Sequence, residues 1–268
     1  MSDPLDPTGI QQKIEAHIMP LSGRMAGALL YRVPDPPALH ILAAQQIIAQ
    51  GRAALTARGT FRIALSGGTT PRGVHEVLAG AATALDWSRV EFYFGDDRSV
   101  PPDHPDSNFG MAKESLFEPL GIKGERIHRM QGEEADLDQA ARAYEAEVLS
   151  GLGAPPRFDL ILMGMGNDGH TASLFPNTAV LLEHDRLVVA NEVPQLKTWR
   201  LTFTYPLLRQ ARGMMFLVAG VSKAAALEAV LEGPDDPTTY PSQAVQLEDG
   251  TLIWMVDEAA ASRLHQFR

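Results

Sequence analysis

A histidine and an aspartate stand two residues apart in the glycine-rich run from Gly164 to His170. A neutral imidazole can accept a proton from water, and a nearby carboxylate can orient the ring and stabilise its charged form. The run also contains G-x-G-x-x-G, but Pro176 follows too soon for the long helix of a dinucleotide site. We predict that His170 is a catalytic base oriented by Asp168; a merely solvated histidine is the alternative.

The run from Ser66 to Pro71 has the composition of an anion-binding turn. Two glycines let the backbone approach an anion, three hydroxyls can donate, and Pro71 suits the first turn of a helix whose N-terminus attracts negative charge. The Gly-Lys-Ser/Thr ending of a Walker loop is missing. The run predicts phosphate binding, and a tight strand-to-helix turn with a capping threonine is the alternative.

Three charged residues, Asp96 to Arg98, directly follow an apolar run. Charges at the end of a buried strand need partners, so they form either a structural ion-pair cluster or an arginine held by carboxylates and aimed at an anionic substrate. Asp103, His104 and Asp106 lie nearby, but their spacing matches no metal-ligand pattern. We therefore expect no metal.

The run from Gly220 to Ala224 nearly matches the nucleophile elbow G-x-S-x-G. A hydrolase of that class would combine Ser222 with Asp249 or Asp257 and with His265. Only 46 residues follow Ser222, too few for the strand and helix units that carry the acid and the histidine. The elbow interpretation is therefore disfavoured.

Lys223 is the more informative residue of this run. Ser222 is a good N-cap, which would place Lys223 in the first helical turn, where the helix dipole disfavours a cation. A charge in an unfavourable place suggests a role such as contact with a phosphate. A lysine that extends into solvent is the alternative.

The elements that position these runs follow from the apolar pattern, in which short apolar runs alternate with helical periodicity. Predicted strands are Ala26–Val33, Phe61–Leu65, Val90–Phe94, Phe158–Met163, Leu187–Ala190, Leu201–Thr204, Met214–Ala219 and Leu252–Val256. Predicted helices are Pro37–Arg58, Arg72–Leu78, Ser107–Phe117, a short piece after His170, and Ser222–Leu231. The alternation indicates an α/β fold: a single doubly wound, Rossmann-like domain with a mostly parallel sheet flanked by helices. In such sheets ligands lie beyond the carboxyl ends of the strands, where all four runs occur.

The composition limits location and partners. The chain has 268 residues, 45% of them apolar, with 23 Lys and Arg against 33 Asp and Glu, a net charge of −10, and no cysteine. This excludes disulfides and thiolate chemistry, and it makes nucleic acid an unlikely partner because an acidic chain repels phosphate backbones. The start, Met1 to Ser22, lacks the basic and apolar regions of a signal peptide, and no run is long enough to span a membrane. We expect a cytoplasmic protein with residues 26–268 as one domain and 1–25 as an extension packed on or near it.

Together these runs resemble the 6-phosphogluconolactonase family, which is related to the glucosamine-6-phosphate isomerase/deaminase group. The similarity extends from about Ala26 to Val256, and Gly166 to Pro176 is its most specific part. Further matching pieces are Ser66 to Pro71, Gly95 to Pro101, Asp106 to Asn108, Lys223-Ala224 and Pro241 to Gln243. The deaminase branch usually has a tyrosine at the position of Arg98. Asp97 stands where glutamate is commoner, which leaves the position of Arg98 open.

The resemblance implies hydrolysis of 6-phospho-D-glucono-1,5-lactone in the oxidative pentose phosphate pathway, without cofactor or metal. By motif position, His170 would be the base and Asp168 its orienting partner. The implied substrate contacts are Ser66, Gly67, Gly68, Thr69, Arg98, Asn108, Arg200 and Lys223. The expected partner is a small phosphorylated sugar lactone, and the expected state is a monomer, with a dimer left open. An amino-sugar-phosphate isomerase or deaminase is the alternative enzyme; a sugar-phosphate sensor would need a DNA-reading helix-turn-helix for which the chain has no room.

Overall fold

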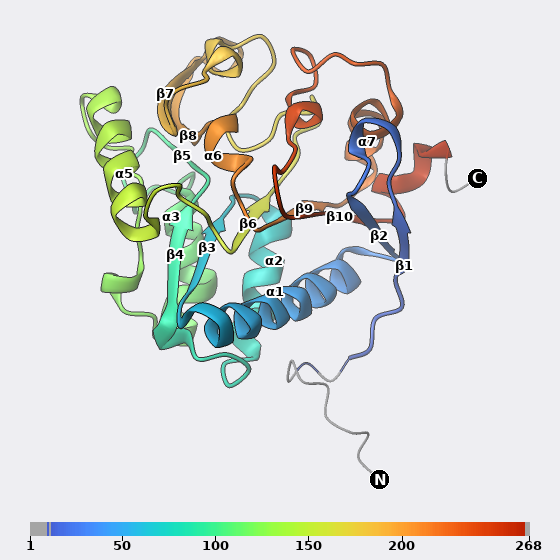
Figure 1. Ribbon diagram of the computed structural model, residues 1–268, viewed down its shortest axis with the longest axis horizontal. Helices are drawn as coiled ribbons and strands as arrows, with labels where there is room; N and C mark the ends of the chain where they lie inside the picture. The colour runs from blue at the N-terminus through green and yellow to red at the C-terminus, as the bar shows by residue number, and fades with distance from the viewer. Residues whose placement is uncertain (1–9, 11, 266–268) are drawn as a thin grey trace.

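The computed structural model describes residue 10 and residues 12–265, and most of the sequence predictions fall within this part of the chain (Figure 1). Residues 1–9, 11 and 266–268 lie outside it, including much of the predicted N-terminal extension. Within that extension, β1 (His17–Pro20) pairs antiparallel with β2 (Leu29–Val33). The segment before residue 26 therefore contributes an edge strand to the sheet.

A seven-stranded sheet forms the centre of the described chain, in the order β1-β2-β10-β9-β6-β3-β4. The remaining bounds are β3 Phe61–Leu65, β4 Val90–Phe94, β6 Leu160–Met163, β9 Gly213–Val218 and β10 Thr251–Asp257. All neighbours from β2 to β4 are parallel. The chain passes from β3 to β4 on one side, and β6 then returns to the other side of β3. The carboxyl ends of β3 and β6 thus lie at a topological switch point, where α/β sheets bind ligands.

Both faces of this sheet are covered, as the alternation of strand residues requires. Leu160 and Leu162 of β6 pack in the core that includes α1 (Pro36–Arg58) and α2 (Thr69–Gly80). Ile161 and Met163 pack in the opposite core, with residues of α5 (Leu137–Leu152) and α7 (Ala224–Glu232). The predicted doubly wound α/β architecture is confirmed.

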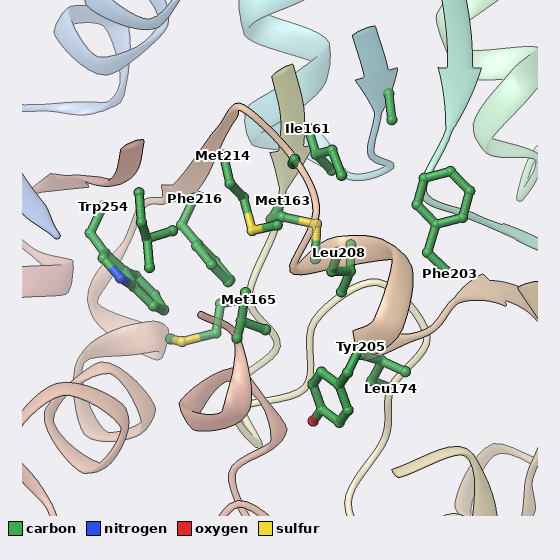
Figure 2. Packing of buried hydrophobic residues seen from close by; sticks show 14 of the residues in the cluster. Ile161, Met163, Met165, Leu174, Phe203, Tyr205, Leu208, Met214, Phe216 and Trp254 are labelled. Atoms are coloured by element: carbon green, nitrogen blue, oxygen red, sulfur yellow. The ribbon is translucent and has the colours of Figure 1, made fainter. Parts of the chain in front are cut away.

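The second core, part of which is shown in Figure 2, also anchors the run that contains His170. Phe216 and Trp254, from adjacent strands β9 and β10, stack with ring centroids 3.9 Å apart. Met165 and Leu174, on either side of the histidine, are buried in the same cluster. Because Met165 and Leu174 are both buried, the position of the turn between them is fixed relative to the core.

A second, antiparallel sheet of three strands stands apart from the main one, in the order β5-β8-β7. Its strands are β5 Asp96–Arg98, β7 Val188–Val193 and β8 Thr198–Phe203. The sequence predicted parts of β7 and β8 but did not separate them from the parallel sheet. It did not predict β5, because two of its three residues are aspartates, which are rare in strands.

Several helical segments differ from the predictions. The helix predicted at Ser107–Phe117 is divided into α3 (Asn108–Ala112) and a π-helical turn (Lys113–Phe117), and α4 (Glu118–Leu120) follows it. The short helix predicted after His170 is wrong: Thr171 forms a bridge with Leu174 instead. The long α5 was not predicted. It buries only two alanines, a tyrosine and a valine, too weak an apolar pattern to recognise.

The remaining helical elements are short connections. They are α6 (Tyr205–Leu208) and 3-10 turns at Gly23–Met25, Trp87–Arg89, Gly124–Arg126, Ala179–Leu182, Pro194–Leu196, Val221–Lys223, Pro241–Ala244 and Ala260–Arg263. Among the described residues, no helix has both the length and the apolar character needed to cross a bilayer.

Candidate active site

A cavity of about 600 Å³ opens beyond the carboxyl ends of β3 and β6. All ten residues singled out from the sequence line it. They are Ser66, Gly67, Gly68, Thr69, Arg98, Asn108, Asp168, His170, Arg200 and Lys223. Residues from six separate stretches of the chain therefore converge on one space large enough for a small metabolite.

His170 and Asp168 form a hydrogen-bonded pair at the cavity wall. His170 Nδ1 lies 2.6 Å from Asp168 Oδ1, and the same oxygen accepts the His170 backbone N–H at 3.2 Å. Because an ionised carboxylate only accepts hydrogen bonds, we assign the ring proton to Nδ1. The imidazole stacks on Phe175 with ring centroids 4.0 Å apart. Nε2 is thus the ring nitrogen available to a ligand.

The electrostatics of this pair suit a base. Burial opposes ionisation of Asp168, but the hydrogen bond and charge of His170 outweigh it, and the pKa of the carboxyl falls below its ordinary value. Asp168 is therefore ionised near neutral pH. A carboxylate at this distance stabilises the imidazolium that forms when Nε2 takes a proton.

The turn that presents the pair depends on glycine. Gly166 N–H donates to the His170 carbonyl at 2.8 Å, and Gly169 N–H donates to the Gly166 carbonyl at 3.1 Å. A Cβ atom on Gly166 would collide with the imidazole ring of His170, at Nδ1, and with the carboxylate of Asp168, at Oδ1. Gly169 has φ +78°, a left-handed conformation that glycine adopts without strain. Chain and side chains are packed too closely here for any larger residue at position 166.

Two arginines face each other across the second sheet. Arg98 of β5 and Arg200 of β8 are direct cross-strand partners, and both line the cavity. Burial, and next the charge of Arg98, lower the pKa of Arg200. Like charges placed opposite each other on paired strands destabilise a sheet. Two guanidinium groups at the cavity wall would favour an anionic ligand there.

The prediction that carboxylates hold Arg98 is wrong. Its Nη1 donates to the Asp106 backbone carbonyl. The Asp97 carboxylate instead accepts the backbone N–H groups of Arg98, Asn108 and Phe109 at 2.8, 2.8 and 3.1 Å. Burial, partly offset by these hydrogen bonds, raises the pKa of Asp97 to about 6. Asp97 therefore fixes the start of α3 rather than the guanidinium.

Lys223 approaches the cavity from the segment after β9. Ser222 is exposed and makes no cap, contrary to the prediction; a 3-10 turn at Val221–Lys223 begins after Gly220, and α7 starts only at Ala224. Lys223 is half-buried. Burial lowers the pKa of its ammonium, and the charge of Asp168 partly offsets this. Lys223 therefore lies within electrostatic reach of the His–Asp pair.

The turn after β3 brings Gly67 against Asn108. A Cβ on Gly67 would collide with the Asn108 amide oxygen, and Asn108 Nδ2 donates to the Asp96 carbonyl at 2.9 Å. Gly68, with φ +107°, precedes α2, so no side chain caps the helix and a capping threonine is not observed. Among the described residues, Ser66 Oγ and Asn108 Oδ1 are buried without a hydrogen-bond partner. Unpartnered polar atoms cost free energy, which points to a site that a ligand completes.

The sequence assigned no role to several residues of the cavity wall, among them Asp96, Ser173 and Phe175. Asp96 is buried and accepts a hydrogen bond from Ser173 Oγ at 2.7 Å, and Phe175 stacks on His170. Asp96 was considered only as part of a charged run, and Ser173 and Phe175 only as part of a motif. Their proximity arises from folding of segments 77 residues apart, which no local pattern reports.

The alternative chemistries lack the necessary geometry. Asp257 is buried and accepts N–H groups of Gly220 and Ala260, while His265 contacts Glu232 at 3.0 Å. Asp249, the other candidate acid, contacts Arg157. The contacts of these three residues therefore do not make up a nucleophile elbow triad with Ser222. Among the described residues, no group of three or more His, Cys, Asp or Glu side chains is arranged to hold a metal ion.

An α/β sheet with a His–Asp pair and three cations around one cavity at its switch point defines an enzyme of small anionic metabolites. The model of the glucosamine-6-phosphate isomerase/6-phosphogluconolactonase family matches residues 34–254, and the chain belongs to this family. A 6-phosphogluconolactonase of Synechocystis sp. is 44% identical over 216 residues, 79% of this chain and 88% of the relative. One of Nostoc sp. is 38% identical over 87% of this chain and 96% of the relative.

Solved structures agree with this assignment. A crystal structure of 6-phosphogluconolactonase from Thermotoga maritima is similar with a TM-score of 0.75 at 29% identity. The match covers 85% of this chain and 98% of the other. The common fold therefore includes nearly the whole of that enzyme.

Proposed function

We propose that this protein hydrolyses 6-phospho-D-glucono-1,5-lactone to 6-phospho-D-gluconate. The observation that carries the proposal is the placement of the His170–Asp168 pair in the same cavity as Arg98, Arg200 and Lys223. A base that can activate water thus faces a space that favours a phosphorylated ligand. Relatives at 44% and 38% identity carry the 6-phosphogluconolactonase name.

Substrate binding and catalysis use different groups in this proposal. The phosphate is held by the three cations and by the turn from Ser66 to Thr69, together with the start of α2. Asn108 contacts the sugar hydroxyls. Fixing the phosphate end places the lactone carbonyl near the base. The free energy of phosphate binding is thus used to position the reacting groups.

The reaction needs one base and one water. His170 Nε2 removes a proton from water as its oxygen adds to C1, and Asp168 stabilises the resulting imidazolium. The bond between C1 and the ring oxygen then breaks, and the imidazolium returns its proton to the leaving oxygen. Backbone N–H groups of the Gly67–Gly68 turn or of the Gly166–Gly169 turn stabilise the oxyanion. No step uses a cofactor or metal.

The physiological setting follows from the substrate. The lactone is formed in the oxidative branch of the pentose phosphate pathway, so we propose that the enzyme acts there, in the cytoplasm. A net charge of −10 disfavours nucleic acid as a partner. We propose that it works as a monomer; a concentration-dependent sedimentation profile would instead indicate a dimer.

A coupled assay tests the activity directly. Freshly generated 6-phosphogluconolactone is supplied, and its disappearance is followed above the spontaneous rate, with glucosamine 6-phosphate as the competing substrate. We expect rapid turnover of the lactone and none of the amino sugar. Turnover of glucosamine 6-phosphate alone would assign the isomerase or deaminase activity instead.

A further inference from the structure

A buried serine far along the chain lies directly behind the His–Asp turn. Both the backbone N–H and the hydroxyl of Ser242 donate to the Gly169 carbonyl, at 3.0 and 2.8 Å. Ser242 is fully buried and does not line the cavity. It therefore contacts the turn but has no access to a substrate.

The peptide group that Ser242 contacts is also a donor to the pair. The Gly169–His170 peptide accepts two hydrogen bonds at its oxygen, and its N–H donates to Asp168 Oδ1 at 3.2 Å. That oxygen in turn accepts from His170 Nδ1 at 2.6 Å. A continuous series of hydrogen bonds thus runs from Ser242 to the imidazole. Hydrogen bonds in series polarise one another, so donation to the carbonyl strengthens the N–H as a donor to Asp168.

Ser242 is itself held in place by its surroundings. Tyr205 Oη donates to the neighbouring Pro241 carbonyl at 2.9 Å. The next residue, Gln243, accepts from Asp236 N–H at 2.8 Å and donates to the Ala229 carbonyl at 2.8 Å. The segment thus has fixed contacts with α6, whose first residue is Tyr205, and with α7. Because Ser242 is fixed by these contacts, it can restrain the turn that carries His170.

The turn has need of such restraint. Gly169 is left-handed, and a Cβ on it would lie 2.8 Å from the Tyr240 ring. Ala172, two residues after the histidine, also has a positive φ of 46°, which is unfavourable for alanine. The backbone conformation from Gly169 to Ala172 is therefore not the one that local propensity favours, and contacts with other segments must stabilise it.

We propose that Ser242 is a positioning residue for the reaction, which fixes the Asp168 carboxylate and hence His170 through the Gly169–His170 peptide. The inference rests on the proposed function, since it assigns His170 as the base. Its effect belongs to the chemical step and not to binding, because the serine touches neither the cavity nor the cations.

The test compares Ser242→Ala, which keeps the backbone donor, with Ser242→Cys, which keeps a weaker side-chain donor of similar size. We expect kcat to fall roughly 3- to 10-fold in the alanine variant, as loss of one hydrogen bond predicts, and less in the cysteine variant. KM and the Kd for 6-phosphogluconate should stay within about 2-fold. Ser262→Ala removes a hydroxyl that donates to the Ala259 carbonyl away from the cavity, and it should leave kcat unchanged.

A proton NMR signal provides a readout that does not need turnover. The His170 Nδ1 proton, in a short bond to a carboxylate, should resonate far downfield and be assigned by its absence in His170→Ala. It should weaken or shift in Ser242→Ala. The His128 Nδ1 proton, 2.6 Å from Glu147 Oε1, is an internal control that should not change.

The outcomes separate the two proposals. An inactive wild type that shows the Ser242-dependent signal would overturn the lactonase function and leave the structural link intact. An active wild type with unchanged kcat and an unchanged signal in Ser242→Ala would overturn the positioning role. A rise in KM equal to the loss in kcat/KM would also overturn it, because it would place the effect in binding.

Discussion

Each ring nitrogen of His170 has a defined position. Nδ1 is committed to Asp168, and one face of the ring packs against Phe175. Only Nε2 is left to meet a water or substrate oxygen. The residue is therefore held in one orientation by three contacts with two side chains: the ring and the backbone N–H both contact Asp168, and the ring packs on Phe175.

Replacement of this histidine tests the catalytic assignment. Because a positioned general base contributes roughly 10²- to 10⁴-fold, His170→Ala should lower kcat by at least 100-fold. The cations remain, so the Kd for 6-phosphogluconate, measured by calorimetry, should change little. Turnover within a few-fold of wild type would make His170 a bystander.

Lys223 is tested by separating binding from stability. A charge-assisted contact with phosphate is worth about 1.5–3 kcal/mol, so Lys223→Met should raise KM for the phosphorylated lactone roughly 10- to 150-fold. The preference over unphosphorylated gluconolactone should shrink similarly. The melting temperature should not fall, because a cation at a helix N-terminus is unfavourable by about 0.3–1 kcal/mol. Lys113→Met, near Glu118, is the control; an unchanged KM and preference would place Lys223 in solvent.

The site residues could be predicted where short runs of the sequence contain the residue types that a site needs. Charged or glycine-rich runs at strand ends, together with the family resemblance for Asn108 and Arg200, identified ten residues that line one cavity. The sequence could not assign their contacts. Asp97 next to Arg98 suggested an ion pair, yet the carboxylate caps backbone N–H groups from α3. Which partner a buried charge takes depends on the tertiary packing.

At the scale of elements, the segment between β6 and the 3-10 turn Ala179–Leu182 presents the proposed base although it contains no helix or strand. It is held by burial of Met165 and Leu174 at its ends and by hydrogen bonds within it. Glycine at position 166 allows the side chains of the pair to lie over the backbone.

Gly166→Ala tests this close packing. The added methyl group would overlap both His170 and Asp168, so the pair must separate. We expect kcat to fall by about 100-fold or more, since small misplacements of reacting groups are costly. KM should change far less, and circular dichroism should show a folded protein. Gly124→Ala, where a Cβ would meet nothing within 4 Å, serves as the matched control; full activity in Gly166→Ala would mean that the pair need not be so close.

Elements were predictable where apolar runs were long. The parallel strands and α1 lie within a few residues of their predicted bounds. The helix expected after His170 is absent because Thr171 Oγ1 donates to the Gly164 carbonyl at 2.7 Å, closing a loop instead. Helix α5 went unrecognised because alanines form much of its buried face. Elements that are short, or whose buried face is rich in alanine, have too weak an apolar pattern to be recognised in the sequence.

At the scale of the whole molecule, Asp97 links stability to pH. Its folded-state pKa of about 6 exceeds the ordinary value near 4, so the native state binds the proton more tightly than the unfolded chain. The contribution of this group to the free energy of unfolding is therefore greatest below about pH 4 and is lost as pH rises through about 6. The loss amounts to roughly 3 kcal/mol at most.

Asp97→Asn removes this titration. Urea unfolding at pH 4 and pH 7 should show a smaller decrease, or a larger increase, in unfolding free energy with pH for the variant than for wild type. Each protein is compared with itself at the two pH values, so the free energy lost with the Asp97 hydrogen-bond acceptor cancels. Asp136→Asn, at an exposed helix cap, is the control. Identical pH dependence in Asp97→Asn and wild type would contradict the raised pKa.

The architecture as a whole was predictable because alternating strands and helices allow few arrangements. The order of strands was not. The apolar pattern of β10 says that it is buried, but not that it lies between β2 and β9. Neither does the pattern of β5 show that it pairs with β8 across about 100 residues.

The position of β10 has a consequence for biosynthesis. β2 ends at Val33, and its parallel neighbour β10 begins only at Thr251. During most of translation, the edge of β2 that pairs with β10 therefore has no partner strand. The nascent protein exposes two strand edges, on β2 and β9, until residue 257 is released. Exposed edges of this kind recruit foreign strands. This strand order therefore predicts dependence on chaperones during synthesis and aggregation of premature-stop products.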